Sequence, residues 1–336
     1  MRSTSNRPTM QDVADKVGVS KATVSLVFRK APGVGDDTRR AVMAAADELG
    51  YRMNRTAALM TARRSHLIGV VAQIRNGFHA EIAEALVAAA DRAGYEIVLG
   101  AVTPTHSETR VIGTLRDFRC EGMLLIGPEL DSVVIEELSA EMPTVVIGRR
   151  MKASSVDVVR TNDGKGIAGM VDYLVGLGHR RIVHVAAGPG LIAADRRNGF
   201  LRALRRHGLS TDDAVVEADS FTEDAGMVAT RTLLERPLPT AVVCANDRLA
   251  VGVLDVLRRE GVAVPEQVSI TGYDDSALAR LSSVDLTTVS QQPRVQADYA
   301  IEAVVSRLDG GRVEQSTETL TPELVVRATT ARPRGI

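Results

Sequence analysis

The chain has 336 residues, of which 45% are hydrophobic and 25% are charged, and its net charge is -1. This length is too great for one ordinary hydrophobic core and predicts two or three domains, and the composition excludes a disordered chain. The two cysteines, Cys120 and Cys244, form no CxxC pair and no His/Cys cluster, which excludes a disulfide scaffold and a zinc module.

No stretch approaches the roughly eighteen apolar residues of a membrane span, and the N-terminus lacks the apolar run of a signal peptide. We therefore expect a cytoplasmic protein without membrane contact. Residues 1–65 carry twelve Lys/Arg and six Asp/Glu, whereas the remainder carries 29 and 36. A basic N-terminal part on an acidic body favours a polyanion as partner of that part, the alternative being an ordinary solvated surface.

Residues 9–29 predict two short helices joined by a tight turn. Thr9 with Asp12 is a helix-start signal, Gly18 ends the first helix, and Ser20 begins the second. The second helix turns Val24 and Val27 inward, and the outward residues are Lys21, Ala22, Ser25 and Arg29. With a third helix over 36–49, this pattern is typical of a helix-turn-helix unit, whose second helix reads the DNA major groove. A three-helix bundle with no role on DNA is the alternative.

A short Ala-rich segment, residues 54–60, follows this unit. Asn54 can cap a helix there, and Ala57 and Ala58 permit close approach between two copies. A helix of this length is marginal in water, so we expect it to form only when it is paired with its twin on DNA. An exposed linker is the alternative.

From His66 onward, apolar runs alternate with helical patterns. The expected strands lie at 67–74, 95–101, 122–127, 143–148, 181–187, 241–246, 268–274 and 323–328, and the expected helices include 80–93, 166–177, 191–207, 223–234 and 248–259. Strict alternation of this kind predicts α/β architecture with two doubly wound, parallel-sheet lobes, divided near residues 156–163. Ligands of such sheets bind at the carboxyl ends of the strands. Polar and aromatic residues at those ends include Asn76, Phe78 and His79, Arg149 and Arg150, Asn162 and Asp163, Arg196, Phe221, Asn246 and Asp247, and Asp274 and Asp275.

Motifs of enzymes are missing or weak. The segment from Gly188 to Ala193 fits a dinucleotide fingerprint formally, but Pro189 and the absence of a first-strand context favour a plain strand-to-helix turn. The sequence has no Walker A loop, HExxH or GxSxG motif. We therefore expect neither an enzyme nor a bound cofactor or metal.

The segments TMQDVADKVGVSKATVSLVF and TRRAVMAAADELGYRMNRTAALM resemble the N-terminal region of the LacI/GalR family of bacterial transcription regulators. Farther along, GLGHRRIVHVA, RRNGFLRAL and ANDRLAVGVLDVLRREGVAVPEQVSITGYDD resemble the family's periplasmic-binding-protein-like domain, so that the resemblance covers nearly the whole chain. It implies a helix-turn-helix domain (1–52), a hinge helix and linker (53–65) and an effector-binding and dimerisation domain (66–336). The first lobe of this last domain would span about 66–161 plus 293–322, and the second about 162–292 plus 323–336.

On matching positions, the resemblance implies that Lys21 and Ala22 choose operator bases and that Met60, beside Leu59, enters the minor groove. In the DNA-binding part, three positions depart from the family pattern: Leu26 stands for the usual Arg, Arg29 for the usual Asn, and Met53 for the usual Pro. In the effector-binding part, Asn162 and Asp163 reverse the usual Asp-Asn order. The full set of expected DNA-binding residues is Thr9, Ser20, Lys21, Ala22, Thr23, Ser25, Arg29, Thr38, Arg39, Asn54, Arg55, Ala57, Leu59 and Met60.

The resemblance also implies a small-molecule effector in a cleft between the lobes. The expected contacts are Phe78, Asn162, Asp163, Arg196, Phe221, Asn246, Asp274 and Gln292. A sugar or sugar derivative stacking on Phe221 is the default, with a nucleoside or nucleobase as the alternative. The sequence therefore predicts a ligand-responsive repressor that binds a palindromic operator as a homodimer. A solute-binding receptor would need a signal peptide or lipid anchor and no basic head, and a sugar-processing enzyme would need a catalytic carboxylate pair.

Overall fold

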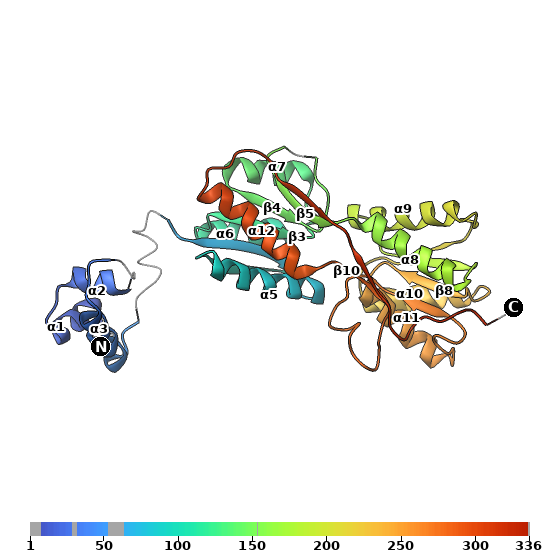
Figure 1. Ribbon diagram of the computed structural model, residues 1–336, viewed down its shortest axis with the longest axis horizontal. Coiled ribbons are helices and arrows are strands. Elements are labelled where there is room, and N and C mark those ends of the chain that lie inside the picture. Colours follow the sequence, from blue (N-terminus) through green and yellow to red (C-terminus); the bar gives the residue numbers. More distant parts are fainter. Residues whose placement is uncertain (1–7, 29–31, 53–63, 153, 335–336) are drawn as a thin grey trace. The chain divides into compact units, whose positions relative to one another are not determined.

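The computed structural model describes residues 8–28, 32–52, 64–152 and 154–334. The chain divides into two compact units, the first ending at Ser65 and the second beginning at His66 (Figure 1). No helix among the described residues is both long enough and apolar enough to span a bilayer.

The first unit is a bundle of α1 (Met10–Val17), α2 (Lys21–Phe28) and α3 (Asp36–Leu49). The expected helix-start signal is confirmed, because Thr9 and Asp12 form a reciprocal capping box, and Gly18 ends α1 with a φ of 73°. The buried core of the bundle consists of Val13, Ala14, Val24, Val27, Val42, Ala45 and Ala46.

The first lobe of the second unit is built on a six-stranded parallel sheet in the order β11-β5-β4-β3-β1-β2. Its strands are β1 (Leu67–Gln73), β2 (Glu96–Val102), β3 (Gly122–Ile126), β4 (Thr144–Ile147), β5 (Asp157–Thr161) and β11 (Thr317–Leu320). Its helices are α5 (Gly77–Arg92), α6 (Glu108–Asp117), α7 (Ser132–Glu141) and α12 (Pro293–Leu308).

Residues along each central strand of this sheet alternate between two hydrophobic cores, as the two-residue period of a strand requires. In β3, Leu124 and Ile126 pack with α5 and α12, whereas Met123 and Leu125 pack with α6 and α7. Figure 1 shows α12 alongside β3, β4 and β5. The sheet is thus covered on both faces, which leaves the ends of its strands as the place for a ligand.

The second lobe has a four-stranded parallel sheet in the order β7-β6-β8-β9. Its strands are β6 (Ile182–Ala186), β7 (Val215–Glu217), β8 (Ala241–Cys244) and β9 (Ser269–Thr271). Helices α8 (Asp163–Leu177) and α9 (Leu191–Arg206) share one core, and α10 (Glu223–Leu234) and α11 (Asp247–Arg259) share another. The expected fold class, a helical head followed by two doubly wound α/β lobes, is confirmed.

One expected strand is shorter than predicted and pairs differently. Strand β12 (Glu323–Val325) replaces the strand expected over 323–328, and it pairs antiparallel with β10 (Thr288–Ser290) outside both parallel sheets. The chain passes between the lobes three times, from β5 to α8, from β10 to α12 and from β11 to β12 (Figure 1).

Candidate functional site

The first unit presents the start of α2 to solvent. Val24 and Val27 are buried, while Lys21 and Ala22 in the first turn are exposed. Ser20 caps the helix, since its Oγ accepts a hydrogen bond from the Thr23 amide at 3.0 Å. A helix anchored in this way holds the first-turn side chains rigidly on the outside of the bundle.

Some of the remaining expected DNA contacts stabilise the bundle, and others lie outside the described residues. Thr9 caps α1, Ser25 and Thr38 are partly exposed, and Arg39 donates from Nη1 to the Val27 carbonyl at 3.3 Å, which joins α3 to the end of α2. Six further residues fall outside the described residues, namely Arg29, Asn54, Arg55, Ala57, Leu59 and Met60.

The second unit contains a cavity of about 840 Å³ between its lobes. Its wall consists mainly of segments that follow the carboxyl ends of the strands of both sheets. From the first lobe come residues 126–132 and 147–149, and from the second come residues 188–193 and 219–222. This is the position at which doubly wound sheets bind ligands.

Five of the eight expected effector residues line this cavity: Phe78, Arg196, Phe221, Asn246 and Asp274. The other three expected residues do not line it. Asn162 is exposed and caps α8 by accepting from the Lys165 amide at 3.0 Å, and Gln292 donates from Nε2 to the Thr321 carbonyl at 3.1 Å. Neither of these two lines the cavity, whereas Gln291, which sequence reasoning missed, does. Asp163 is buried behind Arg196 and supports it.

Arg196 lies at the centre of a buried polar cluster. Its Nε donates to Asp163 Oδ1 at 2.8 Å, and its Nη1 donates to the Ala245 carbonyl at 2.6 Å and lies 3.5 Å from Asp274 Oδ1. The guanidinium carbon lies 3.9 Å from the centre of the Tyr273 ring and 5.9 Å from that of Phe221. The charged plane is therefore fixed in one orientation, with Phe221 and Asp274 beside it at the cavity wall.

Asp274 has an unusual backbone and an unusual acidity. Its φ of 119° lies in the left-handed region, which costs energy for a residue with a side chain and often marks functional sites. Gln291 Nε2 donates to its Oδ1 at 2.7 Å. Burial raises the pKa of Asp274 to about 8, against the opposing charge of Arg196. Asp274 can thus bind as a hydrogen-bond donor or as an acceptor.

Two other side chains of the wall, His79 and Asn246, are held by hydrogen bonds within the protein. Burial lowers the pKa of His79 to about 4, so its ring is neutral, and its Nδ1 accepts from the Gln73 amide at 3.3 Å. Asn246 caps α11 by accepting from the Leu249 amide at 2.9 Å and donates to the Phe221 carbonyl at 3.2 Å. These bonds tie the start of α5, which carries Phe78, to the end of β1 and tie the loop that carries Phe221 to the start of α11.

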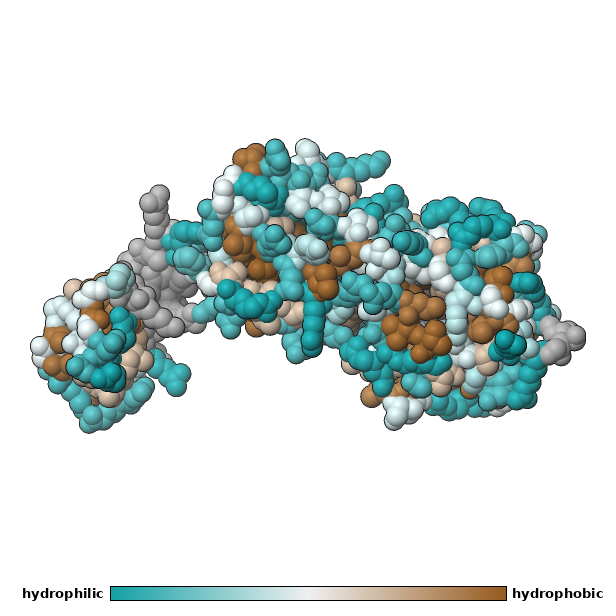
Figure 2. All heavy atoms as spheres, in the orientation of Figure 1, coloured by the Kyte–Doolittle hydropathy of each residue, from teal (hydrophilic) through white to brown (hydrophobic). Residues whose placement is uncertain are grey.

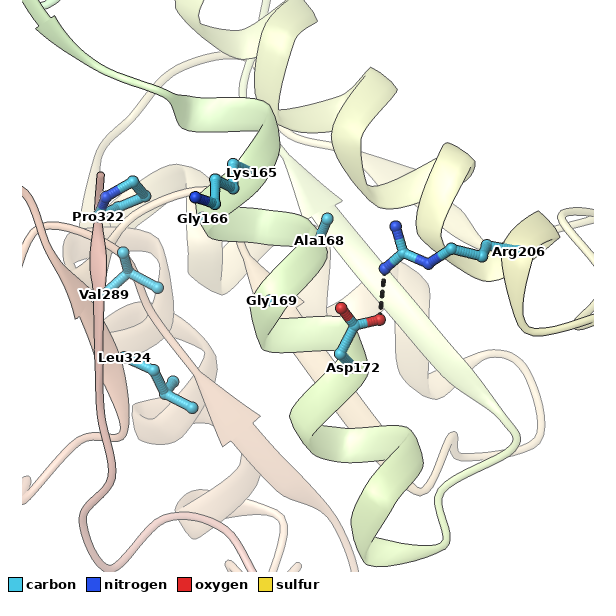
Figure 3. Close-up of a pocket in the computed structure, with 9 residues that line it drawn as sticks. All are labelled: Lys165, Gly166, Ala168, Gly169, Asp172, Arg206, Val289, Pro322 and Leu324. Atoms are coloured by element: carbon cyan, nitrogen blue, oxygen red, sulfur yellow. Dashed lines mark hydrogen bonds and ion pairs between the residues drawn. The ribbon is translucent and has the colours of Figure 1, made fainter. Parts of the chain in front are cut away.

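A second, smaller cavity of about 380 Å³ lies on the second lobe between α8 and the β10-β12 pair. Figure 3 shows Asp172 and Arg206 bonded to each other at its rim, with Val289, Pro322 and Leu324 on the other side. No expected effector residue lines this cavity, so the interlobe cavity is the candidate site.

Comparison with known proteins decides the family. Residues 9–54 match the family described as bacterial regulatory proteins, lacI family, and residues 171–330 match the periplasmic binding protein-like domain. The HTH-type transcriptional regulator CelR of Thermobifida fusca is 32% identical to this chain over 96% of its length and 98% of CelR. The chain belongs to the LacI family. The resemblance read from the sequence is confirmed.

Two solved structures extend the likeness of this LacI-family chain to its fold. A complex of the transcriptional regulator CelR with cellobiose superposes with a TM-score of 0.72 at 31% identity, covering 96% of this chain and 100% of CelR. The lac repressor dimer bound to operator and the anti-inducer ONPF superposes with a TM-score of 0.81 at 28% identity, covering 96% of this chain and 99% of the repressor.

Proposed function

We propose that this LacI-family chain is a repressor that binds a palindromic operator as a homodimer and whose affinity for the operator depends on a sugar-like molecule in the interlobe cavity. The observation that carries the proposal is the presence, in one chain, of an exposed first turn of α2 in a helix-turn-helix unit and of a cavity lined by hydrogen-bonding groups from two lobes. The helix-turn-helix unit also argues against a solute-binding receptor.

The first turn of α2 would read bases. Lys21 is long enough to donate to guanine O6 and N7 in the major groove, and Ala22 is small enough to permit close approach. In a homodimer, two such helices would occupy major grooves about one helical turn apart. We further propose the division into a DNA-binding domain at 1–52, a hinge and linker at 53–65, and an effector-binding domain at 66–336.

The second unit offers apolar surface for a second copy. Three large apolar side chains of the first lobe are about half exposed. They are Ile74, just after β1 (54%), Val87 in α5 (52%) and Leu99 in the edge strand β2 (54%). Figure 2 shows hydrophobic patches among the hydrophilic side chains on one face of this unit. Exposed apolar area of this kind supports self-association, and the lac repressor relative is a dimer on its operator.

The polar wall of the cavity suits a sugar. Asp274, Gln291 and Arg196 supply acceptors and donors for hydroxyl groups, and Phe221 supplies an apolar face for a sugar ring. The CelR relative holds cellobiose, which supports this class of ligand over a nucleobase. A ligand bound to both lobes would favour one interlobe geometry over others.

Selection of bound fragments from random duplex DNA tests the DNA-binding half of the proposal. The full-length chain should enrich a palindrome, and Lys21→Ala should weaken binding to it by about 10-fold to 100-fold, with relaxed preference at the base pair that Lys21 reads. Lys165→Ala removes the same charge from the other unit and should change nothing. Equal weakening of every DNA sequence by Lys21→Ala would contradict base reading.

A further inference from the structure

The interlobe cavity contains a buried arginine that forms no ion pair with a carboxylate of the described residues. Arg149, two residues after the end of β4, is 7% exposed and lines the cavity. Its Nη1 donates to the Pro128 carbonyl at 3.0 Å, and its Nη2 lies 3.4 Å from Ser132 Oγ and 3.2 Å from Met151 Sδ. Its Nε is buried and has no hydrogen-bond partner among the described residues. Burial therefore lowers the pKa of Arg149 below its ordinary value.

The other two arginines of the cavity wall are paired. Arg196 bonds to Asp163 at 2.8 Å, and Arg248 bonds to Glu223 through two hydrogen bonds of 2.8 and 2.5 Å. Within the described parts of the chain, no carboxylate oxygen forms an ion pair with Arg149. A buried guanidinium without a carboxylate is costly unless a ligand supplies the missing charge.

The two carboxylates that influence Arg149 most are already engaged. Glu108 accepts hydrogen bonds from the Glu129 and Leu130 amides at 3.0 Å each, and Asp131 caps α7 by accepting from the Val133 amide at 2.9 Å. Burial raises the pKa of Glu108, which weakens its ability to balance the guanidinium. The exposed carboxylates of Glu129 and Asp219 in the wall accept from Gln73 and Ser220 instead.

A second donor group lies in the same wall. Helix α9 begins after Gly188, Pro189 and Gly190, and its N-cap residue, Gly190, has no side chain to accept from the first-turn amides. Both glycines are required there, because a Cβ on Gly188 would lie 2.2 Å from the Asp219 carbonyl oxygen and Gly190 has a φ of 136°. The other helices that begin at this cavity have side-chain caps, namely Asn76 for α5, Asp131 for α7, Thr222 for α10 and Asn246 for α11. The bare N-terminus of α9 thus offers unused amides and the positive end of a helix dipole.

Arg149 and the start of α9 lie on adjoining parts of the cavity. Arg150, the next residue after Arg149, bonds across the lobes to Asp195 of α9 at 2.9 Å. Residues 188–193 and Arg149 line the same volume. A ligand in the cavity can therefore meet a guanidinium from one lobe and helix amides from the other.

We propose that the ligand of this cavity is an anionic sugar derivative, whose carboxylate or phosphate oxygens accept hydrogen bonds from Arg149 and from the first-turn amides of α9. The proposal rests on the proposed function and narrows its ligand class from sugars in general to acidic sugars. A guanidinium group suits both oxyanions because its charge strengthens the hydrogen bonds that it donates to them. The hydroxyl groups of the same ligand would meet Asp274 and Gln291.

Thermal denaturation of the full-length chain tests this proposal with matched ligands at pH 7.5 and constant ionic strength. The panel pairs glucose with glucose 6-phosphate and glucuronate, and ribose with ribose 5-phosphate, and adds inorganic phosphate against chloride. A ligand that binds the folded state raises Tm. At least one anion should do so, and titration calorimetry should give it a Kd at least tenfold below that of its neutral parent. The phosphate and carboxylate arms identify which oxyanion the site takes.

Arg149→Met should abolish the preference for the anion. Arg116→Met, which removes the same charge from an exposed position on α6 of the same lobe, should leave it intact. Arg149→Lys keeps the charge but loses the planar pair of donors, so it should weaken binding partially and provides the test if the Met variant does not fold.

Three results would overturn the proposal: neutral parents that bind as tightly as the anions, an anion preference that survives in the Arg149 variants, or no anion that raises Tm above chloride. Operator binding is measured separately. A neutral sugar that changes operator affinity would leave the proposed function standing and reject the acidic ligand, whereas absence of any operator would reject the proposed function.

Discussion

At the scale of residues, the buried cluster around Arg196 contains more acidic groups than this one arginine can balance. Asp163 and Asp274 share Arg196, and Asp247, which accepts from Thr288 and Ser276, lies close enough to raise the pKa of Asp274 further. Burial raises the pKa of Asp247 to about 6 as well. Burial raises the pKa of Asp163 too, so the cluster retains a proton near neutral pH.

This retained proton predicts a pH dependence of stability. An unfolded Asp titrates at about 3.9, so between about pH 4 and 8 the folded state holds a proton that the unfolded state has lost. Stability must then fall as the pH rises through this window. Asp274→Asn removes that loss, so the Tm of the variant relative to the unaltered protein should rise from pH 5 to about pH 8 and then level off.

Asp117→Asn, a change at an exposed residue of α6, serves as the control and should show no such trend. A Tm difference for Asp274→Asn that is constant over this pH range would mean that Asp274 is ionised in the folded protein throughout.

Sequence reasoning placed five of its eight expected effector residues correctly in the cavity wall. Phe221, Asn246 and Asp274 closely follow parallel strands, whose ends the apolar runs predict, whereas Arg196 lies in α9. The choice between Gln291 and Gln292 could not be made in this way. Gln292 is the N-cap residue of α12 and has a φ of 54°, a local backbone conformation that no apolar pattern reveals.

At the scale of elements, three helices of the second lobe lie almost where the sequence predicts them. The expected helix over 223–234 coincides with α10, which Thr222 caps, and α9 and α11 differ from expectation by one residue at one end. The elements that went unpredicted include β5, β7 and β10, which have five, three and three residues. Segments this short carry too little periodicity to predict a strand, and the pairing of β10 with β12 depends on contacts between distant parts of the chain.

The capping box of α1 predicts the effect of one substitution on the helix-turn-helix unit. Thr9 Oγ1 accepts from the Asp12 amide, and Asp12 Oδ2 accepts from the Thr9 amide at 2.7 Å. Thr9→Ala should destabilise the unit by about 1 kcal/mol. Hydrogen exchange of the α1 amides in the full-length chain measures this, with about fivefold faster exchange expected.

Gln11→Ala alters the same helix at an exposed position without touching the cap, and it should leave the exchange rate nearly unchanged. Equal exchange rates in the Thr9→Ala variant and the unaltered chain would show that the cap contributes nothing to the stability of α1.

At the scale of the whole molecule, the three crossings between the lobes determine how a ligand could act. Gln292 lies at the crossing from β10 to α12. It donates to two groups at the crossing from β11 to β12, the Thr321 carbonyl at 3.1 Å and Glu323 Oε1 at 2.8 Å. Across the cleft, Glu81 of α5 accepts from the Ala277 amide at 2.6 Å and from Arg280 at 3.0 Å. A ligand that contacts both lobes adds to these interlobe bonds and so favours the geometry in which they form.

Occupation of the interlobe cavity should change the affinity of this LacI-family chain for its operator. Fluorescence anisotropy with the selected operator duplex, with and without the ligand that raises Tm, tests it most directly. Coupling of this kind is typically worth about 1–3 kcal/mol, or roughly 5-fold to 150-fold in Kd. The Kd should shift within that range for the unaltered chain and should not shift for Asp274→Ala, which should bind the operator normally without ligand. An operator Kd that is the same with and without a ligand shown to saturate the cavity would contradict the claim.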